Sequence, residues 1–169
     1  MKTILYLVRH GETVDNARQL MQGQTQGELN DVGIGQARAL SGRLDGVAID
    51  AIVSSDLRRA VDTAAILAAP RGLSVVTTPL LRERDWGSFT GRFIPSLKGE
   101  VWPDDIETLE ALLARARRFL DYVRTRYEGK TVLAVGHGIV NKAIQAVYYG
   151  KQMSEVERMA NCDVRLLEL

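Results

Sequence analysis

The only two histidines of this chain each stand beside glycine at the end of an apolar, strand-like run. Residues 3–9 and 131–135 combine β-branched and other apolar side chains, a pattern typical of buried strands. Glycine next to His10 and His137 lets the chain turn sharply where each run stops. Open α/β sheets bind their ligands at the carboxyl ends of their strands. Either histidine alone also fits a hydrogen-bonded core residue. The pair, with Arg9 directly before His10, indicates a functional site.

Length, charge and cysteine content restrict the class of protein. The chain has 169 residues, 46% of them hydrophobic, which predicts a single domain over 1–169 with a sizeable core. The formal net charge of +1 gives no reason to expect binding to nucleic acid or to an acidic membrane surface. No apolar run is long enough to cross a membrane, and Met1–Thr3 is too short for a signal peptide. Cys162, the one cysteine, cannot form an internal disulfide and fits a reducing compartment as a small, half-buried hydrophobe. We therefore expect a soluble, cytoplasmic protein, and the oligomeric state stays open.

Strand-like and helix-like segments alternate along the chain, which predicts an α/β fold. The expected strands cover residues 3–9, 49–53, 73–77, 131–135 and 163–169, and the expected helices cover 31–44, 57–69, 106–127 and 139–149. Capping side chains are expected from Asn30–Asp31 for the first helix, from Ser54–Asp56 for the second and from Asp104–Asp105 for the third. Residues 16–30 and 80–103 show no helical or strand pattern and are expected to be loops of functional length.

Two groups of arginines are candidates for binding an anion. The guanidinium of Arg9 is a planar fork of donors that matches phosphate oxygens, and His10 beside it is a possible nucleophile. The positive charge of Arg9 favours the neutral imidazole, which is the nucleophilic form. Arg58 and Arg59 lie in the first turn of a predicted helix, where cations are unfavourable unless an anion is bound or Asp56 offsets them. Their side chains point about 100° apart, so at most one of them faces a common pocket.

Glu83 lies between two arginines in the segment Leu81–Gly91. Its spacing fits two interpretations. Glu83 is either one of several alternating charges on a solvent-exposed segment, or a proton donor whose pKa is adjusted for catalysis. Glycine and hydroxyl residues around Trp86 and Phe89 indicate a loop of defined shape. Burial of Glu83 under this loop would favour its protonated form, which a general acid needs.

Four motifs then occur in a fixed order: Arg9-His10-Gly11-Glu12-Thr13 with Asn16, Ser54-Ser55-Asp56-Leu57-Arg58-Arg59-Ala60 with Thr63-Ala64, Leu81-Arg82-Glu83 leading to Gly87 and Gly91, and Gly136-His137-Gly138. Together they closely resemble the histidine phosphatase superfamily in its phosphoglycerate mutase-like branch, and the resemblance runs from residue 3 to the last strand. It implies a three-layer sandwich with a mostly parallel central sheet and helices on both faces.

The resemblance also implies roles for individual residues. His10 is expected to be the nucleophile that forms a phosphohistidine, while Arg9, Arg59 and His137 hold the phosphoryl group. Glu83 is expected to protonate the departing oxygen and then to activate water. Further substrate contacts are expected from Asn16, Gln22, Gly23, Arg84 and Gly138. No metal ion or other cofactor is implied, because arginines and a second histidine supply the positive charge that phosphoryl transfer needs.

The chain departs from the family pattern at two places. Leu20 stands where relatives often carry an arginine, and the predicted cap loop at about 84–104 is much shorter than in the classical mutases. The leading prediction is therefore a metal-independent phosphomonoesterase for a small phosphorylated metabolite. The alternatives are a phosphoglycerate mutase, for which Arg84, Arg92 or Lys98 would replace the missing cation, and a non-catalytic protein that binds a phosphorylated ligand. The physiological substrate stays open. Aromatic residues of this segment either stack on a ring of the substrate or anchor the loop: Trp86, Phe89, Phe93 and Trp102.

Overall fold

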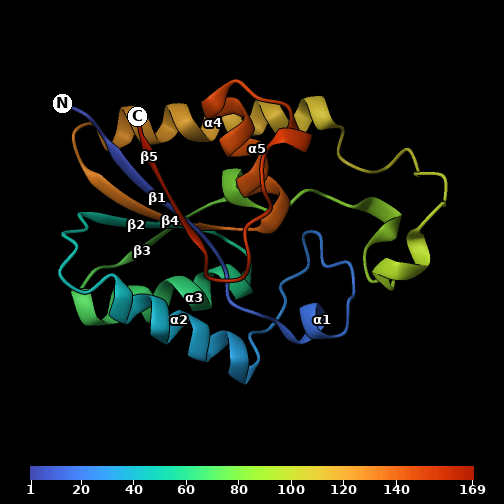
Figure 1. Ribbon diagram of the computed structural model, residues 1–169, viewed down its shortest axis with the longest axis horizontal. Coiled ribbons are helices and arrows are strands. Elements are labelled where there is room, and N and C mark those ends of the chain that lie inside the picture. The colour runs from blue at the N-terminus through green and yellow to red at the C-terminus, as the bar shows by residue number, and fades with distance from the viewer.

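The computed structural model describes residues 1–169 and has a five-stranded sheet at its centre (Figure 1). The strands are β1 (Ile4–Arg9), β2 (Ala51–Ser55), β3 (Val75–Thr78), β4 (Thr131–Gly136) and β5 (Val164–Glu168). Their order across the sheet is β3-β2-β4-β1-β5. The first four are parallel and only β5 runs antiparallel, at the edge beside β1. The predicted α/β class with a mostly parallel sheet is confirmed.

Helices cover both faces of the sheet, which completes the three expected layers (Figure 1). They are α2 (Asp31–Arg43) and α3 (Arg58–Ala68) on one face, and α4 (Leu109–Arg126) and α5 (Gly138–Tyr149) on the other. Alternate residues of a strand point to opposite faces. Leu5 and Leu7 of β1 accordingly pack in the core with α4 and α5, whereas Val8 packs in the core with α2 and α3. The sheet is thus buried on both sides, and functional side chains are left to its strand ends.

Two expected boundaries were wrong, at the loop 16–30 and at the helix 106–127. A short helix, α1 (Val14–Ala17), begins just before the expected loop 16–30 and is closed by a capping box between Thr13 and Asn16. Helix α4 begins at Leu109 behind the N-cap Thr108, not behind Asp104–Asp105. The carboxylate of Asp105 instead accepts hydrogen bonds from the backbone and hydroxyl of Ser88, at 2.9 and 3.2 Å.

Helix α3 also differs from the prediction at its start. Its N-cap is Leu57, which offers no side-chain acceptor. Strand β2 continues to Ser55, whose hydroxyl accepts from the backbone N–H of Leu57 at 3.2 Å. The predicted capping residue Asp56 forms an ion pair with Arg82, with two N–O distances of 2.7 Å. The ion pair therefore ties the start of this helix to the segment that carries Glu83.

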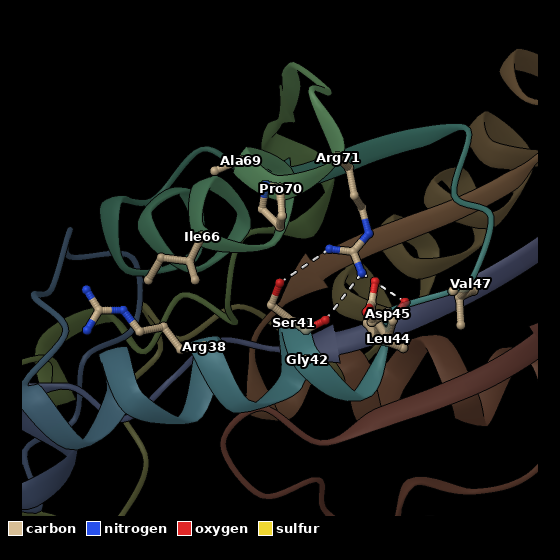
Figure 2. A pocket seen from close by; sticks show the side chains of 11 residues that line it. Arg38, Ser41, Gly42, Leu44, Asp45, Val47, Ile66, Ala69, Pro70 and Arg71 are labelled. Atoms are coloured by element: carbon tan, nitrogen blue, oxygen red, sulfur yellow. Dashed lines mark hydrogen bonds between the residues drawn. The ribbon is translucent and has the colours of Figure 1, made fainter.

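A hollow away from the strand ends lies between α2 and the 3₁₀ turn η1 (Ala69–Arg71), and Figure 2 shows its lining. Its volume is about 710 Å³. Arg71 donates there to the backbone oxygens of Leu67 and Leu44, at 2.7 and 2.9 Å. Those carbonyl groups lie near helix ends, where a cation satisfies them. Neither histidine lines this hollow, and the hydrogen bonds of Arg71 join the ends of the two helices.

Candidate active site

The sheet register brings the two histidines together. Arg9 of β1 pairs with Gly136 of β4, so the next residues of the two strands, His10 and His137, emerge side by side. Their ring centroids are 5.0 Å apart, and the planes of the rings are inclined by 63°. Both residues are buried. The carboxyl ends of the parallel strands β1 and β4 therefore bring the two histidines together, as the two motifs predict.

His10 is held in one neutral tautomer. Its Nδ1 lies 2.6 Å from the backbone oxygen of Gly11. Because a carbonyl oxygen can only accept, Nδ1 carries the proton and Nε2 keeps its lone pair. Burial, and after it the positive charge of Arg59, holds the pKa of His10 well below its usual range. Nε2 is therefore an available nucleophile at neutral pH.

Ser55 of β2 holds the second histidine. Its hydroxyl lies 2.8 Å from Nε2 of His137. A hydroxyl has one proton to donate, and when Ser55 donates it to Nε2 the proton of the neutral imidazole lies on Nδ1. Nδ1 is buried and has no hydrogen-bond partner in the protein. Burial and the charge of Arg59 keep the pKa of His137 well below its usual range, so this ring is also neutral.

Arg59 is enclosed by the loop that follows α1. Its Nη1 donates to the backbone oxygen of Thr25, and its Nη2 donates to that of Gly23 at 2.7 Å. A Cβ atom on Gly27 would lie only 2.9 Å from Cδ of Arg59, so this residue must be glycine for the loop to close. Burial lowers the pKa of Arg59 to about 10, which keeps it charged at neutral pH. Its Nε has no partner in the protein. Arg58, by contrast, is exposed and pairs with Asp62.

Arg9 offers a second unpaired donor at the same place. Its Nη1 donates to the backbone oxygen of Met159 at 2.8 Å, while its buried Nε has no partner. Burial, followed by the charge of Arg158, lowers the pKa of Arg9 to about 10. Buried polar groups normally have hydrogen-bond partners. Unpaired nitrogens on Arg9, Arg59 and His137 thus indicate a site for an acceptor such as an oxyanion.

The carboxyl group of Glu83 borders the same cavity. One carboxylate oxygen accepts from the backbone N–H groups of Arg84 and Val140, at 2.8 and 2.9 Å, and the other accepts from Ile139 at 3.0 Å. Glu83 therefore caps α5, whose own N-cap, His137, provides no side-chain hydrogen bond. The carboxyl group of Glu83 is thus held in place by three backbone N–H groups.

The cavity between these side chains has a volume of about 130 Å³. It is lined by Arg9, His10, Asn16, Leu20, Met21, Gln22, Gly23, Arg59, Glu83, Trp86, Ile94, Ile139 and Arg158. Seven of the ten expected site residues thus lie in the lining: Arg9, His10, Asn16, Gln22, Gly23, Arg59 and Glu83. A cavity of this size with polar groups on several sides suits a small anionic ligand.

Three other expected site residues lie outside this lining. His137 is fully buried beside His10. Gly138 lies under two guanidinium groups, because a Cβ atom added to it would be 3.4 Å from Arg9 and from Arg158. Arg84 turns away and donates to the backbone oxygen of Glu107 at 2.8 Å. The structure therefore does not bring the guanidinium of Arg84 to the cavity.

The aromatic cluster of the predicted cap is mainly an anchor. Trp102 packs edge to face against Trp86 and Phe89, with ring centroids 5.4 and 6.4 Å apart. The guanidinium of Arg84 lies over both tryptophan rings, 5.0 and 5.3 Å from their centroids. Trp86 alone of this cluster reaches the cavity lining. Of the two interpretations of these aromatic residues, the structure thus favours anchoring of the loop.

Three contributors were missed by sequence reasoning. Ser55 lay in a recognised motif without a role, although it ends a buried strand just as Arg9 and Gly136 do. Asn161 donates to the backbone oxygen of His10 at 3.0 Å and thereby fixes the turn after β1. Arg158 lines the cavity. Asn161 and Arg158 carry no motif, and the only signal for them is a polar segment directly before the last strand.

This arrangement can carry out nucleophilic substitution at an anionic centre. A neutral imidazole supplies the lone pair, two charged arginines supply donors, and a carboxyl group supplies a proton acceptor or donor.

No group of three or more His, Cys, Asp or Glu side chains is arranged to hold a metal ion. No helix of the structure is long and apolar enough to cross a membrane.

Comparison with known proteins gives the same family from sequence and from structure. The model of the histidine phosphatase superfamily (branch 1) matches residues 5–169. The probable phosphoglycerate mutase GpmB of Yersinia pestis (strain Pestoides F) is 34% identical over 176 residues, covering 95% of this chain and 82% of the relative. The mycobacterial glucosyl-3-phosphoglycerate phosphatase Rv2419c superposes with a TM-score of 0.88 at 27% identity, covering 99% of this chain and 91% of that one. The phosphoserine phosphatase of Entamoeba histolytica, in complex with 3-phosphoglyceric acid, superposes with a TM-score of 0.87 at 26% identity, covering 97% and 89%.

Proposed function

The chain belongs to the histidine phosphatase superfamily (branch 1), and from this we propose that it is a metal-independent phosphomonoesterase acting through a phosphohistidine on His10. The observation that carries the proposal is the tautomer of His10. Its Nδ1 proton is committed to Gly11, which leaves the Nε2 lone pair inside a cavity that also contains Arg9 and Arg59. A nucleophile prepared in this way beside two cations suits attack on a phosphoryl group.

In the first step, Nε2 of His10 forms a bond to phosphorus while the ester P–O bond breaks. The departing oxygen takes a proton from Glu83, whose carboxyl group borders the cavity. A bound phosphate dianion brings negative charge close to Glu83 and so favours its protonated form. The unpaired nitrogens of Arg9, Arg59 and His137 are suited to hold the phosphoryl oxygens. The hydrogen bond to Gly11 stabilises the positive charge that the imidazole acquires.

In the second step, water attacks phosphorus and the N–P bond breaks. Glu83, now a carboxylate, takes the proton of the water molecule, which restores neutral His10 and releases inorganic phosphate. The same carboxyl group thus acts as acid and then as base. The backbone N–H groups of Ile139 and Val140 hold its oxygens in place for both roles.

A mutase is the second candidate, because the Yersinia pestis relative bears that name. A mutase must keep water away from the phosphohistidine while its substrate turns over in the site. We propose residues 84–104 as a short cap on a single domain. Backbone hydrogen bonds join it to the loop after α1: Met21 donates to Arg92 at 2.8 Å, Gly91 donates to Met21 at 2.7 Å, and Ile94 donates to Gln19 at 2.8 Å. A cap this short leaves the phosphohistidine accessible to water, and Leu20 in the lining provides no cation for a second charged group of the substrate. Both features favour hydrolysis of a small phosphomonoester, which we propose to be cytoplasmic.

Incubation with 3-phosphoglycerate and a trace of 2,3-bisphosphoglycerate tests the two candidates directly. We expect inorganic phosphate to be the main product, whereas isomerisation to 2-phosphoglycerate far faster than phosphate release from any phosphomonoester would assign the chain as a mutase. Release of phosphate from none of a panel of phosphomonoesters would leave a binding protein.

Trapping experiments test the role of His10. Labelled substrate should leave an acid-labile, base-stable adduct on the wild-type protein, and His10→Ala should abolish both adduct and turnover while the protein stays folded. Arg59→Ala and Arg58→Ala form a matched pair, because Arg59 lines the cavity and Arg58 is exposed and paired with Asp62. Only the first substitution should lower kcat/KM strongly. Near-normal activity of His10→Ala would refute the phosphohistidine.

A further inference from the structure

Arg158 is a free cation at the mouth of the cavity. It lies in the connection between α5 and β5 and borders both the active-site cavity and the hollow beside it. Its side chain forms no ion pair with any carboxylate of the protein. Its backbone is nevertheless fixed, because the neighbouring side chains of Val156 and Met159 are buried. Arg158 thus presents an unpaired guanidinium to both the cavity and the hollow, where it can pair with an anionic ligand.

Arg158 also stands close to another arginine. Nε of Arg158 and Cζ of Arg9 would both lie 3.4 Å from a Cβ atom on Gly138, so the two guanidinium groups share the same glycine. Arg9 is further tied to this segment by its hydrogen bond to the backbone oxygen of Met159, at 2.8 Å. Like charges at close range repel each other. The repulsion contributes, after burial, to the lowered pKa of Arg9. An anion bound beside both arginines would relieve it.

The other arginines near the mouth are already occupied. Arg92 makes a two-pronged ion pair with Glu100, with N–O distances of 2.8 and 2.7 Å. Arg84 lies over the tryptophan rings of the cap and donates to a backbone oxygen. Neither residue lines the cavity, and neither does Lys98. The cation that Leu20 does not provide is therefore supplied from the opposite end of the chain, by Arg158.

The hollow beside Arg158 gives the rest of a substrate a path out of the site. It has a volume of about 480 Å³ and shares Arg9, Asn16, Ile94 and Arg158 with the active-site cavity. The only acidic side chain in its lining is Glu12, whose carboxylate accepts from Asn30 at 2.8 Å. A substrate with its phosphoryl group at His10 would therefore extend over Arg158 into this hollow.

We propose that Arg158 binds a carboxylate group on the substrate and so selects phosphorylated carboxylic acids, an inference that rests on the proposed phosphatase function. The planar fork of a guanidinium matches the two oxygens of a carboxylate. One free arginine beyond the phosphoryl site balances one further negative charge. Arg158 is thus a specificity-determining residue, and Glu83 and His10 remain the groups at the reacting bond.

The test compares two substrates that differ only in the group in question. Glycerol 3-phosphate has a hydroxymethyl group where 3-phosphoglycerate has its carboxylate. We expect the wild-type protein to prefer 3-phosphoglycerate, and Arg158→Gln to lower the ratio of the two kcat/KM values about tenfold, the loss of roughly one charge-assisted hydrogen bond. The change should come mainly from KM. Arg92→Gln is the matched control, because it removes a paired arginine outside the cavity, and it should keep the wild-type ratio.

Binding measured without turnover separates this inference from the proposed function. Calorimetry on His10→Ala should show tighter binding of 3-phosphoglycerate than of glycerol 3-phosphate, and the added substitution Arg158→Gln should remove the difference. Selective binding that depends on Arg158, in a protein whose wild-type form hydrolyses nothing, would overturn the phosphatase and keep the anion site. Equal ratios in wild type and Arg158→Gln, or no preference for the carboxylate in either measurement, would overturn the role of Arg158.

Discussion

Substitution of Glu83 by glutamine separates its chemical role from its structural role. The carboxylate accepts three backbone N–H groups, and two of them, from Ile139 and Val140, belong to the first turn of α5. A glutamine offers one oxygen and one NH₂ group, so one of these N–H donors would face another donor. Glu83→Gln therefore changes the start of the helix as well as removing the proton.

The two effects have different sizes and different signatures. Leaving the N–H of Ile139 without an acceptor costs about 1–3 kcal/mol of folding free energy, whichever substrate is used. Loss of general acid catalysis costs about 10²–10⁴-fold in rate, but only where the leaving oxygen needs a proton. An alkoxide such as that from glycerol 3-phosphate needs one, whereas nitrophenolate is stable as an anion. The ratio of the two rates therefore isolates the proton transfer.

We expect Glu83→Gln to slow glycerol 3-phosphate hydrolysis at least about 10²-fold more than nitrophenyl phosphate hydrolysis. The control is Glu107→Gln, which alters a neighbouring, mostly buried carboxylate that pairs with Arg115 outside the cavity. This variant should lose stability in urea denaturation and keep the wild-type ratio of rates. Equal losses on both substrates in Glu83→Gln would assign Glu83 a structural role only.

Three further outcomes follow from contacts of the site. Ser55→Ala removes the hydroxyl that holds Nε2 of His137 and should lower kcat about tenfold. Ser55→Thr keeps the hydroxyl and should restore most of the rate. Equal rates in the two variants would exclude a positioning role for Ser55. Within α2, Gly33→Ala should lower the free energy of unfolding, because the new Cβ would overlap the backbone oxygen of Glu12. A Cβ on Gly35 would meet nothing within 4 Å, so Gly35→Ala should raise the free energy of unfolding by about 0.5–1 kcal/mol. Urea titration of both variants measures the difference. The pKa values of His10 and His137 lie well below the ordinary value of 6.5, so near that pH the unfolded chain binds protons that the folded chain does not. The free energy of unfolding should therefore fall as the pH drops through 6.5, as urea titration at each pH would measure. A free energy of unfolding that rises on acidification through this range would contradict the neutral state of the two rings.

The fold and the centre of the site were predictable because both depend on local patterns. Apolar runs that end in Arg9-His10 and Gly136-His137 fix two strands, and parallel strands end at the same edge of a sheet. The helix through residues 31–43 was predicted with its N-cap, because Asn30 accepts from Gly33 at 2.8 Å. Short-range signals of this kind need no knowledge of what packs against them.

Errors arose where a polar residue found its partner far away in the sequence. Asp56 and Asp105 each precede a predicted helix and were expected to cap it. Asp56 instead pairs with Arg82, and Asp105 binds Ser88, 17 residues earlier. Glu83 does the reverse, because it caps a helix that begins at Gly138. A capping pattern in sequence shows that a carboxylate is available, and tertiary structure decides which N–H groups it satisfies.

The direction of the last strand explains why Arg158 and Asn161 were not predicted. A parallel strand begins at the amino edge of the sheet, so a polar segment before it would lie far from the site. Strand β5 is antiparallel and therefore begins at the edge where β1 and β4 end. The connection from α5 must return to that edge, and Cys162, with a φ of 58°, turns it there by donating its N–H to the backbone oxygen of Arg9 at 2.9 Å. One reversed edge strand thus brings the segment around Arg158 and Asn161 to a site whose other residues come from 9–94 and 136–140.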